Sequence, residues 1–243
     1  MSGHGAYMDD SVSQKVQGFP NWGWRVGSAL AFRYLSFVAM IALSLWAENR
    51  PAPHLPDLLM DRLPYYAQLD RYNYLLLTAG YLPFAFLLLI HNPGRFCRYT
   101  ISAGLLSLVR GVCIVMTGLG PVRGDDLHAG FLQHDPAVFG KALLELASPF
   151  GILFRDAPHV YLTKDLFFSG HTAATFLLLL YVWRYRPLRW AMLLSHIVVV
   201  ASVFFSHLHY SIDVLGAYAV TLALFSVREG WPQGLANPIQ DHV

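Results

Sequence analysis

Charged side chains are scarce in this sequence. Only 13% of its 243 residues are Asp, Glu, Lys or Arg, whereas 55% are hydrophobic. Soluble domains usually carry about 25% charged residues, so the shortage disfavours a soluble globular protein and favours one that folds within a membrane. The formal net charge is only +2, and no nucleic-acid partner is expected.

Cysteine is scarce as well, and its placement excludes two kinds of site. Cys97 and Cys113 fall in one apolar stretch, sixteen residues apart, and on a single helix they cannot reach each other to form a disulfide or share a metal. His128 and His134 lack a neighbouring cysteine and a firm ligand spacing. No metal and no cofactor are therefore expected.

Long apolar runs are abundant. A helix needs roughly 20 apolar residues to cross the hydrocarbon core of a bilayer. Six runs approach that length, at residues 26–46, 72–90, 98–119, 167–183, 188–206 and 210–227. They predict an all-α polytopic membrane protein, a six-transmembrane-helix bundle. The first run starts well inside the chain and lacks a small-residue cleavage site, so we expect a retained helix and not a signal peptide.

The charges predict how this bundle is oriented. Arginines and lysines gather in the N-terminal tail, the turns at 91–98 and 184–189, and the C-terminal tail, which the positive-inside rule places in the cytoplasm. Most acidic residues lie in the alternate loops, 47–71 and 120–166. We therefore expect both termini in the cytoplasm.

The domain organisation follows from these assignments. We expect a cytoplasmic tail at residues 1–25, one membrane catalytic domain at 26–228 and a cytoplasmic tail at 229–243. Within the long loop that ends at residue 165, an amphipathic helix is expected near 137–146. That helix either shapes a lateral entrance for lipids or is a surface segment without a role.

Two segments carry the candidate chemistry, Ser-Gly-His-Thr at 169–172 and His-Tyr-Ser-Ile-Asp at 209–213. His209 and Asp213 are four residues apart, so on a helix the carboxylate can accept the imidazole N–H. An oriented imidazole is a good nucleophile, and a second histidine, His171, can handle the proton of the leaving group. Each histidine alone is more simply structural. Together, on the predicted extracytoplasmic face, the three residues indicate phosphoryl transfer through a phosphohistidine.

Four further residues are candidates for binding the substrate phosphate. Ser169 and Gly170 can expose N–H groups at a helix N-terminus, although an ordinary N-cap explains them too. Arg110 lies within an apolar run, where it either binds phosphate or pairs with a buried acid such as Asp213. Lys164 is either a phosphate ligand or a solvated surface lysine.

Two other histidines are expected to play lesser roles. His207 is too close to His209 for both to face the site, so it is assigned to the rim. His196 lies deep in its apolar run and is expected to be a core polar group with its hydrogen bonds satisfied.

These motifs resemble the sphingomyelin synthase family, within the wider type 2 phosphatidic acid phosphatase superfamily. Besides residues 168–172 and 209–213, two weaker segments fit, Leu-Pro-Asp at 55–57 with a later Pro64, and residues 110–121. The resemblance covers roughly residues 26–228.

The sequence also departs from the phosphatases of that superfamily. Their Lys-x6-Arg-Pro element is not found, and their Ser-Arg pair would fall at Ser202-Val203, where valine replaces arginine. The loss of these phosphate-binding arginines is similar to the synthases, which transfer a head group.

The resemblance implies a lipid phosphotransferase. A phospho-head-group (choline, ethanolamine or inositol) would move from a donor glycerophospholipid to ceramide or a related lipid alcohol such as diacylglycerol. His209 would attack phosphorus, Asp213 would stabilise the imidazolium-like state, and His171 would exchange the proton with the two lipid alcohols. No metal is required. The active site would face the periplasm of a bacterial plasma membrane, or the Golgi lumen or cell exterior in a eukaryote.

Two alternatives remain. The same histidines could let water complete the reaction, which would make the protein a lipid phosphatase or a phospholipase-C-like hydrolase. A channel or transporter could instead relay protons through histidines. The ionisable residues gather at one face and do not line a path across the bilayer, which disfavours this second alternative.

Overall fold

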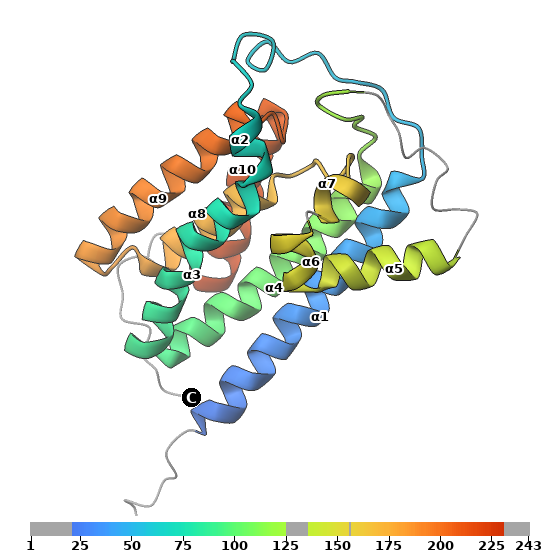
Figure 1. Cartoon of the computed structure of the whole chain (residues 1–243). Helices are drawn as coiled ribbons and strands as arrows, with labels where there is room; N and C mark the ends of the chain where they lie inside the picture. The colour runs from blue at the N-terminus through green and yellow to red at the C-terminus, as the bar shows by residue number, and fades with distance from the viewer. Residues whose placement is uncertain (1–20, 125–135, 156, 231–243) are drawn as a thin grey trace, which may run out of the picture.

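The structure, a computed structural model, describes residues 21–124, 136–155 and 157–230 (Figure 1). In these ranges all regular secondary structure is helical, and there is no strand. The helices are α1 (Trp22–Glu48), α2 (Ala67–Arg71), α3 (Asn73–His91), α4 (Pro93–Met116), α5 (Pro136–Ala147), α6 (Pro149–Phe154), α7 (Ala157–Tyr161), α8 (Gly170–Val182), α9 (Arg186–Phe205) and α10 (Ser211–Glu229). The predicted all-α class is confirmed. Most of both predicted tails lies outside the described residues.

Within the described residues, five helices are long and apolar enough to cross a membrane: α1, α3, α4, α9 and α10. The sixth predicted span corresponds to α8, which has only 13 residues. At 1.5 Å per residue, that is about 20 Å of helix against about 30 Å of hydrocarbon core. The expectation of six full-length helices is therefore confirmed only in part, because five helices are long enough and α8 is not.

α8 is short because it lies in the centre of the bundle. It packs against α3, α4, α9 and α10, and apolar side chains such as Leu177 and Leu178 are fully buried on it. A helix that is apolar on all sides belongs in such a position. The non-helical backbone that leads into α8 is largely buried, with Leu166, Phe168 and Ser169 each at most 4% exposed, and such backbone is tolerated at membrane depth only in that setting.

One end of the bundle is closed by a buried polar cluster. Arg98 forms an ion pair with Glu229 at 2.8 Å, and the hydroxyl of Tyr181 donates to the same carboxylate at 2.6 Å. The Nε of Arg95 donates to the carbonyl of Tyr181 at 2.6 Å. These contacts join α4, α8 and α10 at the end away from the catalytic motifs.

The long connection between α4 and α8 carries three short helices. The amphipathic helix expected near 137–146 is confirmed as α5, which packs Ala142 and Leu146 against Met40 and Ile41 of α1. In Figure 1, α5, α6 and α7 lie together beside α1 and α4. This segment is therefore a packed part of the bundle wall.

The opposite end, which we call the loop end, carries residues 49–66, α2 and the turn from α9 to α10 (Figure 1). Asp57 ties the loop to the bundle, because its carboxylate accepts the backbone N–H of Ser211 at 2.6 Å and those of Leu59 and Met60. Burial acts to raise the pKa of Asp57, and these hydrogen bonds outweigh it, so the pKa lies below its ordinary value of 3.8.

Asp57→Asn is expected to lower stability by about 1–3 kcal/mol at neutral pH, since hydrogen bonds to a buried carboxylate are lost. A lowered folded-state pKa means that the carboxylate stabilises the fold above about pH 4 and that this contribution fades as the pH falls further. Thermal unfolding of both proteins in detergent between pH 3 and 7 would check this. A difference that grows on acidification would contradict it.

Candidate active site

His171 occupies the first turn of α8. Ser169 caps that helix, its Oγ accepting the backbone N–H of Thr172 at 3.4 Å and the hydroxyl of Thr172 at 3.1 Å. The backbone N–H of Ser169 donates to the carbonyl of Asp213 at 3.1 Å. The two motifs, 40 residues apart in sequence, are therefore joined directly by backbone.

His209 lies beside Asp213, with its Nδ1 3.5 Å from the carboxylate Oδ2. Asp213 also accepts the backbone N–H of Tyr210 at 2.9 Å as part of a capping box. α10 begins only at Ser211, so the N-terminal capping turn brings the pair together, and not a shared helical face as the spacing suggested. Within the described residues, His209 Nδ1 and Asp213 Oδ1 have no hydrogen-bond partner.

The two histidines face one another across a short gap. The ring centroids of His171 and His209 are 6.5 Å apart, and the ring of Tyr74 meets His171 edge-on at 5.0 Å. Each histidine is only 5% exposed. His171 Nε2 has no hydrogen-bond partner among the described residues. This spacing leaves both rings within reach of one substrate group.

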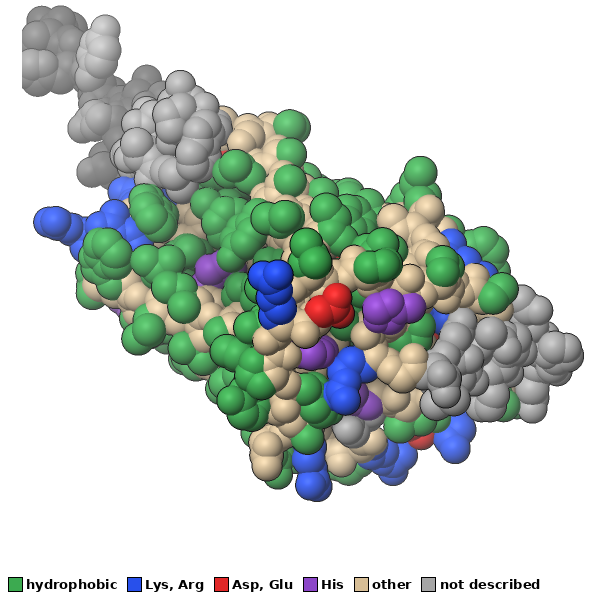
Figure 2. Space-filling view, turned by 90° about the horizontal axis from the view of Figure 1, so that it is seen from above, with side chains coloured by type: hydrophobic (Ala, Val, Ile, Leu, Met, Phe, Trp, Pro, Cys, Tyr) green, Lys and Arg blue, Asp and Glu red, His purple; other side chains and the backbone are tan. Residues whose placement is uncertain are grey.

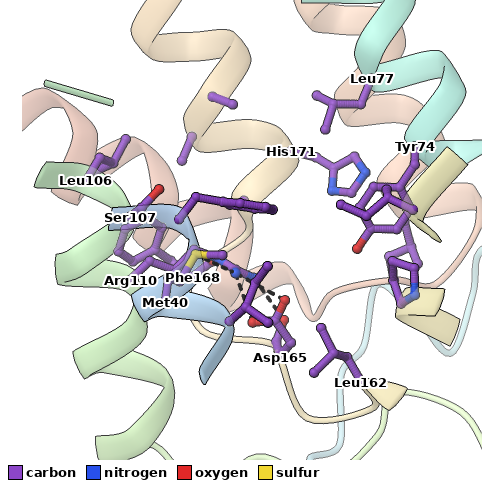
Figure 3. Close-up of a pocket in the computed structure, with 18 of the residues that line it drawn as sticks. Met40, Tyr74, Leu77, Leu106, Ser107, Arg110, Leu162, Asp165, Phe168 and His171 are labelled. Atoms are coloured by element: carbon purple, nitrogen blue, oxygen red, sulfur yellow. Dashed lines mark hydrogen bonds and ion pairs between the residues drawn. The ribbon is translucent and has the colours of Figure 1, made fainter. Parts of the chain in front are cut away.

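Both histidines line a cavity of about 310 Å³. Its walls come mainly from α1, α3, α4 and α8, and are largely apolar, with Leu77 on α3 and Leu106 on α4 (Figure 3). Polar residues gather where His171, His209 and Arg110 meet. A polar reaction centre at the end of an apolar cavity suits an amphipathic substrate.

Arg110 pairs with Asp165 and not with Asp213. Its Nη1 lies 2.8 Å from the Asp165 carboxylate, its Nη2 donates to the Asp165 carbonyl at 2.9 Å, and its Nε donates to the carbonyl of Phe168 at 2.6 Å (Figure 3). The guanidinium therefore holds the segment that leads into His171. It also lines the cavity, so a role toward substrate phosphate stays a prediction.

Gly170 lets this guanidinium approach α8. A Cβ at position 170 would lie 3.2 Å from Nε and 3.3 Å from Cζ of Arg110. Gly170→Ala is therefore expected to displace Arg110 or the start of α8 and to lower the rate of the predicted head-group transfer about tenfold or more, because small displacements of reacting groups are costly. The matched control is Gly140→Ala on α5, where an added Cβ meets nothing within 4 Å. Equal rates for the two variants would refute the positioning argument.

Lys164 points away from the histidines. Its ammonium group donates to the carbonyls of Glu48 at 2.8 Å and Arg50 at 2.7 Å, at the C-terminal end of α1. This placement gives no support to the predicted phosphate-binding role.

A second, polar cavity of about 430 Å³ adjoins the first at the loop end. The two share the walls formed by His159, Leu162, Thr163, Leu166 and Leu208. Histidine, arginine and acidic side chains gather near the middle of this end of the molecule (Figure 2). The predicted rim residue His207 lines this cavity, has a positive φ of 52°, and its Nε2 contacts the carbonyl of Leu63 at 3.1 Å.

The second cavity also contains a His–Asp pair that the sequence did not reveal. His159 Nε2 lies 2.7 Å from Asp70 Oδ1, and the Tyr65 hydroxyl donates to Asp70 Oδ2 at 2.7 Å. Burial acts to raise the pKa of Asp70, but the hydrogen bonds from His159 and Tyr65 hold it below its ordinary value. No spacing rule links positions 70 and 159, so only the fold could bring them together.

His196 is a satisfied core residue, as predicted, because its ring nitrogens contact Thr175 Oγ1 at 2.7 Å and the Tyr218 hydroxyl at 2.8 Å. Cys97 and Cys113 are free thiols. No cluster of three potential metal ligands occurs in the part of the chain that the structure describes. His128 and His134 lie outside that part.

Tyr210 joins the two weaker motif segments to the catalytic turn. Its hydroxyl accepts the backbone N–H of Leu55 at 3.0 Å and contacts the carbonyls of Gly120 at 3.0 Å and Pro121 at 3.1 Å. Residues 55–57 and 120–121 therefore support the turn that carries His209. In the sequence, the signal for this contact was that residues 55–57 and 110–121 both fit the same family as the histidine motifs.

Comparison with known proteins agrees with this geometry. Residues 164–229, which include both histidines, match the family described as PAP2 superfamily C-terminal. The chain is 28% identical over 207 residues to human sphingomyelin synthase-related protein 1, covering 81% of this chain and 48% of that protein.

Two further relatives carry enzymatic names. Human phosphatidylcholine:ceramide cholinephosphotransferase 2 is 28% identical over 221 residues, covering 85% of this chain and 59% of the relative. Rat phosphatidylcholine:ceramide cholinephosphotransferase 1 is 27% identical over 199 residues, covering 76% and 44%. The chain spans about half the length of these relatives. The predicted resemblance to the sphingomyelin synthase family is confirmed. The apolar helices of this chain and its similarity to these relatives identify an integral membrane protein.

Proposed function

We propose that this protein is a lipid phosphotransferase that moves a phospho-head-group from a glycerophospholipid to ceramide or a related lipid alcohol. The observation that carries the proposal is the His171–His209 pair, 6.5 Å apart at the polar end of an apolar cavity, with Asp213 beside His209. The names of the cholinephosphotransferase relatives support the reaction class and suggest phosphatidylcholine and ceramide as substrates.

The first half-reaction uses both histidines. Because Nδ1 of His209 faces Asp213, Nε2 is the nitrogen that attacks phosphorus. The P–N bond forms as the P–O bond to diacylglycerol breaks, and protonated His171 gives its proton to the departing oxygen. The Asp213 carboxylate stabilises the positive charge that develops on the His209 ring.

The second half-reaction reverses these roles. The acceptor hydroxyl gives its proton to His171, its oxygen attacks phosphorus, and the P–N bond breaks to release His209. Positioning of the reacting groups within the cavity does most of the work, as expected for phosphoryl transfer. The N–H group of Gly170 and the guanidinium of Arg110, which both line the cavity, are the proposed phosphate contacts. Ser169, also predicted for this role, instead donates its N–H to the carbonyl of Asp213.

The same proposal places the chain in the membrane. Six crossings, α8 being the short one, with both termini in the cytoplasm, put the loop end on the extracytoplasmic side. Basic residues near the opposite end, such as Arg95, Arg98 and Arg184, support this orientation, because the positive-inside rule places them on the cytoplasmic side.

The second cavity favours one alternative outcome. It is lined by several polar and charged side chains, lies at the loop end and adjoins the cavity that the histidines line, so it offers water a route to the phospho-enzyme. Hydrolysis through the same intermediate would give a phospholipase-C-like activity.

Purified protein in lipid vesicles would separate the two outcomes. Donor phospholipid labelled in its head group is supplied with and without ceramide, and products are identified by mass spectrometry. Transfer predicts labelled phospholipid product only when ceramide is present. Release of free phospho-head-group at the same rate with or without ceramide would defeat the transferase proposal.

A further inference from the structure

A second arginine lines the catalytic cavity. Arg33 of α1 donates from Nη1 to Ser107 Oγ at 2.8 Å, and its guanidinium carbon lies 5.7 Å from the centre of the Phe37 ring. Arg110 in the same cavity is matched by Asp165, whereas Arg33 meets no carboxylate within the described residues. An arginine inside a membrane helix is costly unless its charge is used.

The guanidinium of Arg33 is directed toward the reaction centre. Ser36 packs against Gly104, where an added Cβ would lie 3.2 Å from its hydroxyl, so the backbone of Arg33 lies beyond Gly104 on the side away from the loop end. Its side chain nevertheless reaches back to Ser107. Long basic side chains usually extend toward the nearest water, which for Arg33 would be at the N-terminal end of α1. The Arg33 side chain instead extends into the cavity.

Helix geometry gives the depth of this charge. Ser107 precedes Arg110 by three residues, a rise of about 4.5 Å along α4. Arg110 in turn packs against Gly170, next to His171. The Arg33 guanidinium therefore lies about one helical turn deeper in the cavity than the histidines.

Other hydrogen-bond donors line the same cavity on α3 and α4. Tyr81, Tyr99 and Ser107 all line the cavity. The group contains hydroxyls and a guanidinium but no acid, so it suits a ligand that offers hydrogen-bond acceptors.

We propose that Arg33, with Ser107, binds the carbonyl oxygens of the linkages between a lipid's backbone and its acyl chains. The inference rests on the proposed function, which puts phosphorus between the histidines. In a glycerophospholipid the ester carbonyls lie a few bonds beyond phosphorus toward the tails, and in ceramide the amide carbonyl lies similarly close to the reacting hydroxyl. Both fall about one helical turn deeper than the reaction centre, where Arg33 is.

The test compares two phosphatidylcholines that differ only in these carbonyls. One carries two ester-linked oleoyl chains and the other the same chains in ether linkage. Binding is measured by native mass spectrometry on His209→Ala protein, which does not consume the lipid, and transfer rates are measured on protein with His209 intact. We expect the diester lipid to bind about tenfold more tightly, as hydrogen bonds to a charged donor predict.

Arg33→Met in the same background should abolish the preference by weakening diester binding to the level of the diether. Arg25→Met is the matched control, since Arg25 is an exposed arginine of the same helix, and it should keep the tenfold preference. Arg33→Lys, which keeps the charge and loses the planar fork, should reduce it.

Three results would overturn the inference. The first is equal binding of the two lipids to the parent protein, a comparison that needs no change at Arg33. The second is an equal loss of both lipids in Arg33→Met, which would assign the charge to phosphate. The third is an undiminished preference in Arg33→Met.

If ester preference depends on Arg33 but no head group is transferred, the proposed function fails and the carbonyl contact stands. If transfer occurs without preference, only the contact fails.

Discussion

His209→Ala is expected to lower head-group transfer by at least about 10³-fold, because the proposed nucleophile is removed. Its ring is nearly buried beside Asp213 and faces His171 across 6.5 Å. Donor lipid labelled at phosphorus should leave label on the parent protein in a rapid quench, and none on the variant.

The matched control is His91→Ala. His91 is exposed at the C-terminal end of α3, and its ring Nδ1 contacts the carbonyl of Leu87 in the same helix at 2.9 Å. It should retain its transfer rate and its label. A folded His209→Ala protein with full lipid turnover would remove the enzymatic assignment of this site.

His171→Ala is expected to reduce transfer from natural phospholipid by about 10²–10⁴-fold, the usual contribution of a positioned acid–base group. The departing diacylglycerol alkoxide is a poor leaving group, so it depends on the proton. A donor with a p-nitrophenol leaving group needs no proton on departure. With that donor the first half-reaction of His171→Ala should recover to within about tenfold of the parent, as measured by release of nitrophenolate.

The same donor should not rescue His209→Ala, and this contrast separates the two roles. If both variants are equally inactive with nitrophenyl phosphocholine, His171 is not the acid. If both recover, neither histidine is the nucleophile.

Tyr74 packs edge-on against His171. Tyr74→Phe keeps this ring contact and should therefore leave most of the activity.

Much of the fold was predictable because it depends on apolar length. The ranges expected for five helices agree with α1, α3, α4, α9 and α10 to within about five residues. The largest error is the start of α4, expected at residue 98 and observed at Pro93. Asn92 caps that helix by accepting the Arg95 backbone N–H at 2.8 Å, and this Asn-Pro start signal lies outside the apolar run.

The site was predictable only where its residues are close in sequence. His209 with Asp213, and Ser169 with Thr172, are local pairs whose contacts follow from capping turns. The partner of Arg110 is 55 residues away. Asp213 and Asp165 were equally available to it by composition, and only the course of the chain before α8 selects Asp165.

Arg33 shows the same limit more sharply. In the sequence it is one charge in an apolar run, and nothing in its spacing connects it to Ser107, 74 residues away. The contact depends on the side-by-side packing of α1 and α4 (Figure 1).

The brevity of α8 has a consequence for how such a protein would be assayed. The 13-residue helix begins at the turn that carries His171, so on the proposed topology the reaction centre would lie within the thickness of the bilayer, where molecules already dissolved in it can reach it. The effective substrate concentration is then the mole fraction of each lipid in the membrane. The transfer rate should fall when the substrate lipid is diluted within the membrane by inert lipid or detergent. The potencies of inhibitors should be compared only after correction for how strongly each inhibitor partitions into the membrane.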